Sequence, residues 1–439
     1  MKLSLKKYLL PLGLLIALVI SLLFSYLIWI NPARPQTNSG SNTPSSNNTV
    51  ADGISKKIGD IYLPTNLVFN TQVKQYRLTS ATVDLTNYAK KQLVKWDYGQ
   101  IKKMGPKSAE DYQAYLQMKN ALVLNYPAQV TVATVGSAFN FKATAYNSGM
   151  VSRIVVPLEK TKHIYLLDDK KQLIYRVTVK RASDNKLITM ANDKDNRRSE
   201  VSFEKLGDKY TLFYQTGVRV AQYSYLLNKE TMGLFVTRLL SSNNTGSITA
   251  KEQNGVTTYS DGNSMRLTIK KKTGAVAFSD YNNGTSRSNY SYANYLSAGL
   301  TNLNSIGVSL DDVRYDCYDT KRHLLVYRNY INGYPVIANE NAGSYSIVLT
   351  NSGGKKIDFS IYTLQIPVPA VGGDISLPAT NQVLDSLSVN GYSREQIKDI
   401  KIGYSWNQNQ STSQVVDLEP TYFVKYNGQW LDYQSLVNN

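Results

Sequence analysis

Between Tyr8 and Ile30 the chain carries no charged side chain, and most of the residues in this stretch are aliphatic. A helix rises about 1.5 Å per residue, so a helix of this length can cross a hydrocarbon core about 30 Å thick. We therefore expect a single N-terminal transmembrane helix over residues 8–30.

The flanks of this stretch predict its retention and its orientation. It ends in Leu-Ile-Trp-Ile before Asn31, without the small residues of a signal-peptide cleavage site, so we expect it to remain in the mature protein. Three lysines precede it, whereas Arg34 is the only charged residue between Ile30 and Asp52. This asymmetry predicts a cytoplasmic tail over residues 1–7 and an extracytoplasmic C-terminal region, in a single-pass protein of the cell membrane.

The chain is basic, with 49 Lys and Arg residues against 32 Asp and Glu residues. An exported chain does not meet nucleic acid, so we expect no nucleic-acid partner. The charge suits an anionic wall polymer, anionic lipid or an acidic protein, and a generally basic solvated surface is the alternative. The single cysteine, Cys317, and the two histidines exclude an intramolecular disulfide and a closed Cys/His zinc site. We expect no metal and no cofactor.

Composition also indicates the boundaries of a linker and of the domains that follow it. Residues 31–57 are expected to form a flexible linker, because 35–50 contain many Ser and Asn residues and no charge. Beyond the linker, mixed helical and extended patterns predict an α+β fold with three extracytoplasmic domains. Their expected bounds are 58–205 for the N-terminal domain, 206–285 for the middle domain and 286–439 for the C-terminal domain. An extended run, a helix and further extended runs recur in the last two, which is compatible with a similar topology.

Local patterns predict the elements within these domains. Helices are expected over 86–103, from the Ser108/Asp111 capping box to a point before Pro127, over 223–240, over 290–306 with an end at Gly307, and over 380–389. Extended runs are expected at 73–85, 129–134, 151–157, 163–167, 173–180, 209–220, 256–280, 313–318, 323–331, 345–350, 356–366 and 415–434.

Two tripeptides resemble motifs of penicillin-binding proteins, namely Ser183-Asp184-Asn185 and Lys272-Thr273-Gly274. That chemistry also needs an upstream Ser with a Lys three residues later, and the only upstream match is Ser4/Lys7 on the predicted cytoplasmic flank. Both tripeptides lie between alternating runs, which predicts hairpin turns instead. We therefore assign no catalytic residue and expect a protein that is not an enzyme.

Segments spread over the chain share an order with one known family. They are LIWINPAR at 27–34, DIYLPT at 60–65, IVVPL at 154–158, IYL at 164–166, GYSW at 403–406 and VDLEPTYFVKY at 416–426. In this order they resemble the YycH family of regulatory proteins from low-GC Gram-positive bacteria. The resemblance implies a regulator of the WalK (YycG) sensor histidine kinase that acts with the companion protein YycI and influences cell-wall metabolism. It also implies three extracytoplasmic domains, of which the second and third share a topology.

Candidate partner contacts follow from the physics of membrane helices and of protein interfaces. Small residues occupy one face of the predicted membrane helix at Gly13, Ala17, Ser21 and Ser25, where they allow close helix approach or simply face lipid. Tyr404 and Trp406 are either interface anchors or core residues. The alternative function is a membrane-tethered enzyme of the cell wall or a wall-polymer-binding protein.

Overall fold

The computed structural model describes residues 55–143, 146–159, 161–240, 248–282, 284–369, 372–409 and 411–437. Among these residues, no helix is both long enough and apolar enough to cross a membrane. The predicted cytoplasmic tail, the predicted membrane helix with its four small residues, and residues 31–54 of the predicted linker lie outside the described residues.

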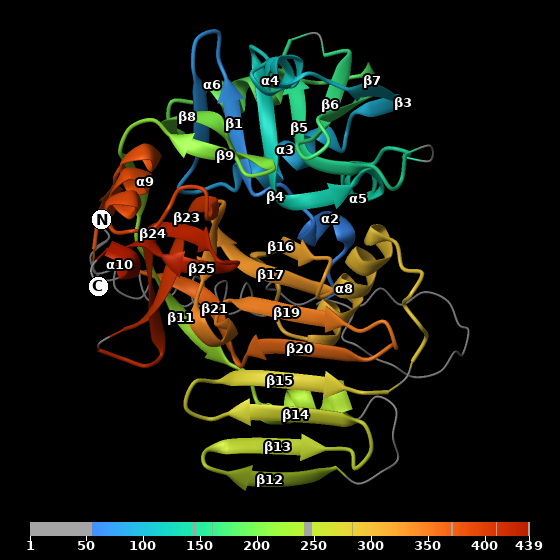
Figure 1. Cartoon of the computed structure of the whole chain (residues 1–439), viewed down its shortest axis with the longest axis vertical. Coiled ribbons are helices and arrows are strands. Elements are labelled where there is room, and N and C mark those ends of the chain that lie inside the picture. The colour runs from blue at the N-terminus through green and yellow to red at the C-terminus, as the bar shows by residue number, and fades with distance from the viewer. Residues whose placement is uncertain are drawn as a thin grey trace, which may run out of the picture. The chain divides into compact units, whose positions relative to one another are not determined.

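The first sheet has nine antiparallel strands in the order β3-β7-β6-β5-β4-β1-β2-β8-β9 (Figure 1). Its strands are β1 (Asn66–Asn70), β2 (Gln75–Thr79), β3 (Asp97–Pro106), β4 (Ala121–Thr131), β5 (Met150–Pro157), β6 (His163–Asp168), β7 (Leu173–Arg181), β8 (Arg197–Leu206) and β9 (Lys209–Tyr214). The central strands β4 and β5 are nearly continuous apolar runs, because both faces of the sheet are buried. We call this sheet with its helices, residues 55–214, the N-lobe.

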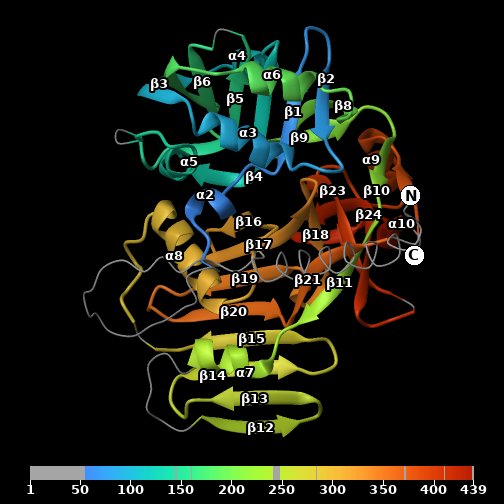
Figure 2. The ribbon, with the colours of Figure 1, turned by 180° about the vertical axis from the view of Figure 1, so that it is seen from behind.

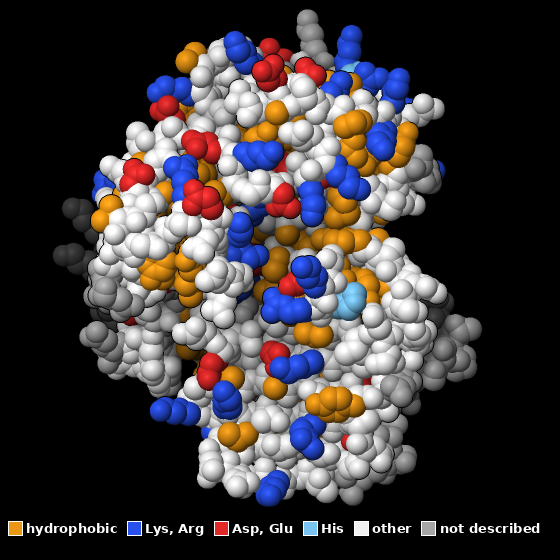
Figure 3. All heavy atoms as spheres, viewed as in Figure 1, with side chains coloured by type: hydrophobic (Ala, Val, Ile, Leu, Met, Phe, Trp, Pro, Cys, Tyr) orange, Lys and Arg blue, Asp and Glu red, His pale blue; other side chains and the backbone are white. Residues whose placement is uncertain are grey.

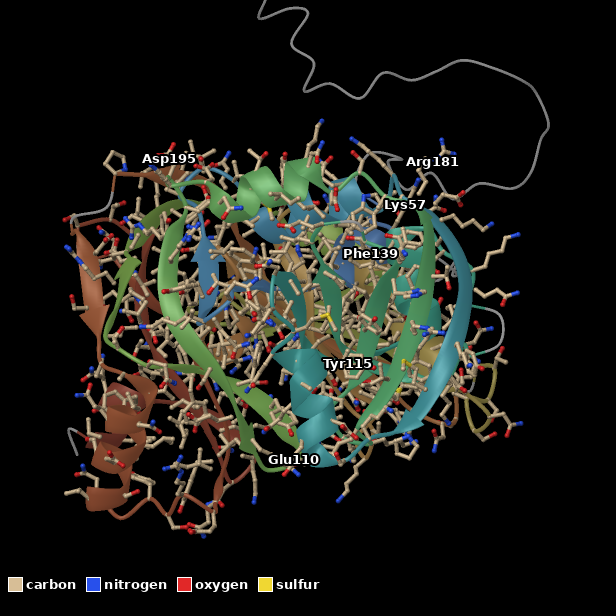
Figure 4. All side chains as sticks on the ribbon, turned by 90° about the horizontal axis from the view of Figure 1, so that it is seen from above. Lys57, Glu110, Tyr115, Phe139, Arg181 and Asp195 are labelled. Atoms are coloured by element: carbon tan, nitrogen blue, oxygen red, sulfur yellow. The ribbon has the colours of Figure 1, made fainter. Side chains whose placement is uncertain are left out.

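The helices of the N-lobe are α2 (Ile58–Ile61), α3 (Leu85–Leu93), α4 (Ala109–Leu116), α5 (Val132–Phe139) and α6 (Asn185–Asn192). Side-chain caps explain where α3, α4 and α5 begin, the last at Thr131, whose hydroxyl accepts from the amide of Thr134. Asp84 accepts hydrogen bonds from the first backbone amides of α3, and Ser108 accepts one from the amide of Asp111 in α4, as the capping pattern predicted. Figure 4 shows α4, with Glu110 and Tyr115, on one side of the strands and Phe139 of α5 on the other side.

The second sheet has fourteen strands and runs from β12 at one edge to β21 at the other. Its strands are β11 (Tyr223–Lys229), β12 (Thr249–Gln253), β13 (Val256–Ser260), β14 (Met265–Lys270), β15 (Ala275–Asp280), β16 (Val313–Asp319), β17 (Leu324–Ile331), β18 (Tyr334–Ile337), β19 (Ser344–Leu349), β20 (Lys355–Ser360), β21 (Tyr362–Val368), β23 (Ile397–Gln408), β24 (Val415–Tyr426) and β25 (Gln429–Asp432). A separate pair joins β10 (Val218–Ala221) to β22 (Asp374–Leu377). We call residues 218–437 the C-lobe.

Helical segments cover the second sheet. They are α7 (Met232–Phe235), a π-helical turn η1 (Val236–Leu240), α8 (Tyr292–Ile306), a 3-10 turn η2 (Asn339–Asn341), α9 (Thr380–Val389) and α10 (Tyr433–Val437). Helix α8 ends at Gly307, which has the left-handed conformation expected of a helix-terminating glycine. Figure 2 shows α7 and α8 across one face of the sheet, where α8 packs on β19 and η1 packs on β14.

Several local predictions are wrong. The helix expected from Ser108 to a point before Pro127 ends at Leu116, because residues 121–131 form β4, and the extended run expected over 129–134 ends where α5 begins at Val132. Residues 97–103, expected to be the second half of a helix over 86–103, belong to the edge strand β3, because the helix ends at Leu93 and Trp96 turns into the core. Residues 223–229, also expected to be helical, form β11, which pairs with β21 and β24 on its two sides. The run after Ser183-Asp184-Asn185 forms helix α6 rather than the second strand of a hairpin. At β3 and β11, strand pairing overrides a local apolar spacing that fits a helix as well as a strand.

The fold is mixed α+β, as the sequence predicts, and it consists mostly of sheet. The tracts 206–285 and 286–439 contribute strands to one hydrogen-bonded sheet, through the pairing of β15 with β20 and of β11 with β21 and β24. Strand β9 pairs with β8 in the N-lobe sheet. Two apolar clusters run through both lobes, so the core of the described unit is continuous.

Candidate functional site

The main candidate site is a cavity of about 380 Å³ between the two lobes. We call it the junction cavity. Its N-lobe wall comes from β1, β2, β4, β5 and β9 and from the turns after β6 and β8. Its C-lobe wall comes from β16, β17, β18, β23 and the Tyr292 end of α8. Figure 3 shows basic side chains gathered between the two lobes, beside a hollow with apolar side chains along it.

On the N-lobe wall, Arg153 of β5 forms a buried ion pair with Asp169. Its Nε donates to Asp169 Oδ1 at 3.0 Å and its Nη2 donates to the other carboxylate oxygen. The same carboxylate accepts from the hydroxyl of Tyr112 at 2.7 Å and from the backbone amide of Tyr210 at 3.1 Å. Burial raises the pKa of Tyr112 far above its ordinary value, so its hydroxyl remains a donor. The hydrogen bonds of this ion pair are therefore made to groups of the protein itself.

Behind the C-lobe wall, Asp316 of β16 is the centre of a second buried network. Its carboxylate accepts from Lys401 Nζ at 2.9 Å, from Arg328 Nε at 3.0 Å and from the Tyr330 hydroxyl at 2.7 Å. Burial alone would raise the pKa of Asp316, but the two cations and these hydrogen bonds outweigh it and hold the pKa well below its ordinary value. Lys401 also lies over the ring of Trp430, with Nζ 4.2 Å from the ring centroid.

Polar contacts connect the two walls of the junction cavity. Lys209 of β9 forms an ion pair with Asp399 of β23, and the Thr211 hydroxyl donates to the same carboxylate at 3.3 Å. The Tyr292 hydroxyl at the start of α8 donates to the carbonyl oxygen of Gln129 in β4 at 2.8 Å. These contacts fix the lobes against each other on both sides of the cavity.

Arg77 of β2 is the exception among the cations of the wall. It is 5% exposed, and its guanidinium lies over the ring of Tyr334, 3.7 Å from the centroid. Its donors reach the Tyr214 hydroxyl and the carbonyl oxygen of Gly333, the latter at 2.9 Å. Within the described part of the chain, Arg77 has no carboxylate partner, and its Nε has no hydrogen-bond partner.

The chemistry of the other candidate groups is limited. Desolvation raises the pKa of the Cys317 thiol to about 11, so the thiol is neutral at physiological pH and is a poor nucleophile. No group of three or more His, Cys, Asp and Glu side chains within the described ranges is arranged to hold a metal ion. The Lys272-Thr273-Gly274 motif forms the predicted turn between β14 and β15, and Ser183-Asp184-Asn185 leads into α6 in the N-lobe.

The predicted ectodomain anchors have different environments. Tyr404 is 1% exposed; its hydroxyl donates to the carbonyl oxygen of Ala221 at 2.9 Å, and its ring packs edge-on against Tyr223 and Tyr334. Trp406 is half-buried, further along β23. The structure therefore places Tyr404 in the core, where it can support a surface but cannot itself contact a partner. Gly13, Ala17, Ser21 and Ser25 lie outside the described residues.

The residues of the junction cavity were not anticipated from the sequence. A signal existed for Arg153, a charged residue inside the apolar run of β5, because a charge in such a position must be paired. No comparable signal marks Arg77, because β2 alternates polar and apolar residues and Arg77 falls at a position that reads as solvent-exposed. Its burial depends on Tyr334, more than 200 residues away in the sequence.

Comparisons with known proteins extend over both lobes. The family model of the YycH protein N-terminal domain matches residues 10–197, and that of the YycH protein C-terminal domain matches residues 215–436. No curated protein matches the chain. The solved structure of YycH from Bacillus subtilis is similar with a TM-score of 0.70 at 17% identity, over 86% of this chain and 97% of that chain. An uncharacterized protein from Eubacterium rectale gives a TM-score of only 0.30 at 10% identity, over 49% of this chain and 82% of that chain, and carries no argument.

Proposed function

The chain belongs to the YycH family, and from that premise we propose that it is a membrane-anchored, non-enzymatic regulator of a WalK-type sensor histidine kinase. In this proposal it acts together with a YycI-like single-span protein and thereby influences cell-wall metabolism. Its N-terminus is cytoplasmic and both lobes are extracytoplasmic.

The observation that carries the proposal is the match of both family domains, which together account for most of the chain. The fold shared with the Bacillus subtilis YycH structure supports the same assignment at the level of architecture. A regulator can shift a kinase between two states only by the free energy with which it discriminates them. Lobes that share a continuous core and several polar contacts are suited to this task, because they present one fixed surface to a partner.

The predicted membrane helix supplies a second contact in this proposal. Small residues at Gly13, Ala17, Ser21 and Ser25 would allow a partner helix to approach closely, since association in lipid depends on packing rather than on the hydrophobic effect. Contacts of this kind contribute about 0.6–2 kcal/mol each, so a single substitution should weaken association without abolishing it.

The test is recovery of partners with the full chain from membranes of its own host, solubilised in detergent. We expect a sensor histidine kinase and a second single-span protein to co-purify. Ala17→Leu should reduce their recovery several-fold, whereas Leu15→Ala, on another face of the helix, should have little effect. Recovery of wall polymer without a kinase would favour the alternative of a wall-binding protein and would contradict the proposal.

A further inference from the structure

The outer strands of the N-lobe sheet carry an excess of positive charge. Strand β3 is the edge strand and pairs with β7, and the two strands together hold one acidic residue, Asp97. On these strands and beside them lie eight cations, which we call the basic edge: Lys95, Lys102, Lys103, Lys107, Lys162, Arg176, Lys180 and Arg181. None of the eight has an ion-pair partner within the described ranges. Figure 3 shows Lys and Arg side chains gathered at this corner of the N-lobe, and Figure 4 shows Arg181 at its margin.

The stability of the sheet does not explain the basic edge. Lys102 of β3 lies directly opposite Arg176 of β7, and like charges in this position weaken strand pairing. The next strand, β6, carries His163, whose Nδ1 is buried without a hydrogen-bond partner among the described residues. Partial burial, together with the nearby cations Arg176 and Lys162, lowers the pKa of His163, so its ring is neutral at physiological pH. This part of the N-lobe therefore has a positive potential that its own side chains do not neutralise.

The directions of the side chains indicate the shape of a partner. Consecutive residues of a strand point to opposite faces of a sheet, so Lys102 and Lys103 project to the two sides of β3. A flat bilayer can contact only one of these sides at a time. A flexible chain of anionic groups can contact both, because it can follow the edge of the sheet.

The backbone of β3 disfavours another elongated partner, an added β-strand. The pairing of β3 with β7 has register shifts at three points, and the strand contains Gly99, Gly105 and Pro106. Irregular edges of this kind are poor templates for a further strand. The side chains of the basic edge are therefore the groups that a partner meets. Six of the eight are lysines, which bind phosphate as point charges and lack the planar fork with which arginine recognises carboxylates.

We propose that the basic edge binds a linear phosphodiester polymer, which lies along β3 and contacts cations on both of its sides. The strand has 10 residues, and at about 3.3 Å per residue it is about 33 Å long, which is enough for several repeat units. Binding through phosphate charges needs no fixed register between the two chains. The proposal rests on the extracytoplasmic location of the lobes in the proposed function, since the anionic polymers of a cell wall are met there.

The experiment measures the affinity of the full chain, in nanodiscs of neutral phosphatidylcholine, for fluorescently labelled poly(glycerol phosphate) by anisotropy. Unlabelled dextran, poly-glutamate and vesicles of phosphatidylglycerol are the competitors, compared at equal concentrations of repeat units or lipid. We expect saturable binding that weakens as salt is added, with the labelled polymer displaced best by its own unlabelled form. Better displacement by poly-glutamate would indicate an acidic protein, and better displacement by vesicles a bilayer. Either result, displacement by dextran, or no binding at about 50 mM salt would overturn the proposal.

Two variants of equal net charge locate the site. The combination of Lys102→Gln, Lys103→Gln and Lys180→Gln should weaken binding by about tenfold or more. It should also reduce the slope of log affinity against log salt by about 2, as expected for three lost phosphate contacts. The matched control combines Lys251→Gln, Arg266→Gln and Lys272→Gln, at exposed C-lobe cations that also have no ion-pair partner in the described part of the chain. A loss of affinity in the first variant no greater than in the control would overturn the proposal.

His163 provides a second readout, because the chain has only two histidines. In NMR spectra of the full chain labelled at histidine, bound polymer should raise the pKa of His163, since its phosphates offset the potential of Arg176 and Lys162. The signal of His323, in the C-lobe, should not move. A change at His323 without a change at His163 would overturn the assignment of the site. Neither measurement needs a kinase, so failure here is distinct from failure of the proposed regulatory function.

Discussion

At the residue scale, the junction depends on buried charges whose desolvation is offset by several hydrogen bonds each. Asp316 accepts from two cations and a tyrosine, and Asp169 accepts from an arginine, a tyrosine and a backbone amide. Such clusters add little net stability compared with an apolar core, but removal of one member leaves the others charged and unpaired. The cost of a substitution should therefore exceed the value of any single contact.

Asp316→Asn should lower the free energy of unfolding at pH 7 by about 3–5 kcal/mol, because Lys401 and Arg328 would keep their charges without a counter-ion. The pKa of Asp316 is lower in the folded protein than in the unfolded chain, where it is near its ordinary value of about 4. Its contribution is thus complete above that value and decreases as the pH falls through it. Urea unfolding at pH 7 and at pH 3 should show a smaller acid loss in the variant than in the wild type.

Asp319→Asn is the matched control for this prediction. Asp319 lies on the same strand and pairs with Arg322, but the Arg322 side chain is 68% exposed and that of Asp319 is 32% exposed, so the change should lower the free energy of unfolding by less than about 1 kcal/mol. Similar costs for the two variants would contradict the network described for Asp316.

The environments of Tyr404 and Trp406 predict different effects on folding and on association. Tyr404→Ala should cost about 3–5 kcal/mol, as for other large buried aromatic residues, and should reduce partner recovery only through the loss of folded protein. Replacement of the half-buried Trp406 by Ala should lower the free energy of unfolding by a smaller amount. Thermal unfolding measured together with partner recovery distinguishes an effect on folding from an effect on association. If Tyr404→Ala loses the partner but keeps normal stability, the placement of Tyr404 in the core is contradicted.

At the element scale, the sequence predicted elements whose signals are local. Helix α4 begins at the Ser108 cap, α8 ends at Gly307, and the strands of the meander β13–β15 follow their alternation. The failures at β3 and β11 occur where apolar spacing fits both structures and distant strands decide between them. The junction cavity could not be predicted for the same reason, because its two walls meet only through pairings and contacts between distant parts of the chain.

Two helix-terminating glycines provide a comparison at this scale. Gly307 has a φ of +76°, and a Cβ there would overlap the side chain of Arg238, whose Nη1 donates to the Gly307 carbonyl oxygen at 2.8 Å. Gly391, after α9, has a φ of +87° with open space around it. Gly391→Ala should lower the free energy of unfolding by about 1–2 kcal/mol, because alanine is strained in the left-handed backbone conformation. Gly307→Ala should cost clearly more, because Arg238 must also move, and equal costs in urea unfolding would refute this account.

At the scale of the whole described unit, the lobes share their interior. The segment between α2 and β1 carries Tyr62, whose hydroxyl donates to the Leu296 carbonyl oxygen of α8 at 2.5 Å and lies 2.8 Å from the Tyr327 hydroxyl of β17. Its ring packs 5.1 Å from that of Tyr315. A residue of the N-lobe is thus fully buried in the C-lobe, and a core of this kind couples the unfolding of the two parts.

This coupling predicts how the central strands exchange their amide hydrogens. In the wild type, β5 of the N-lobe and β19 of the C-lobe should become exposed in one global opening, with equal opening free energies. Tyr62→Ala removes a buried ring and two hydrogen bonds, and should lower both values by the same amount, about 3–5 kcal/mol. Tyr281→Ala, at a side chain that is 70% exposed, should leave both unchanged. Hydrogen exchange of the full chain, followed by mass spectrometry in increasing urea, measures both strands in one sample. If Tyr62→Ala lowers the opening free energy in only one lobe, the lobes unfold separately and the shared core does not make them one cooperative unit.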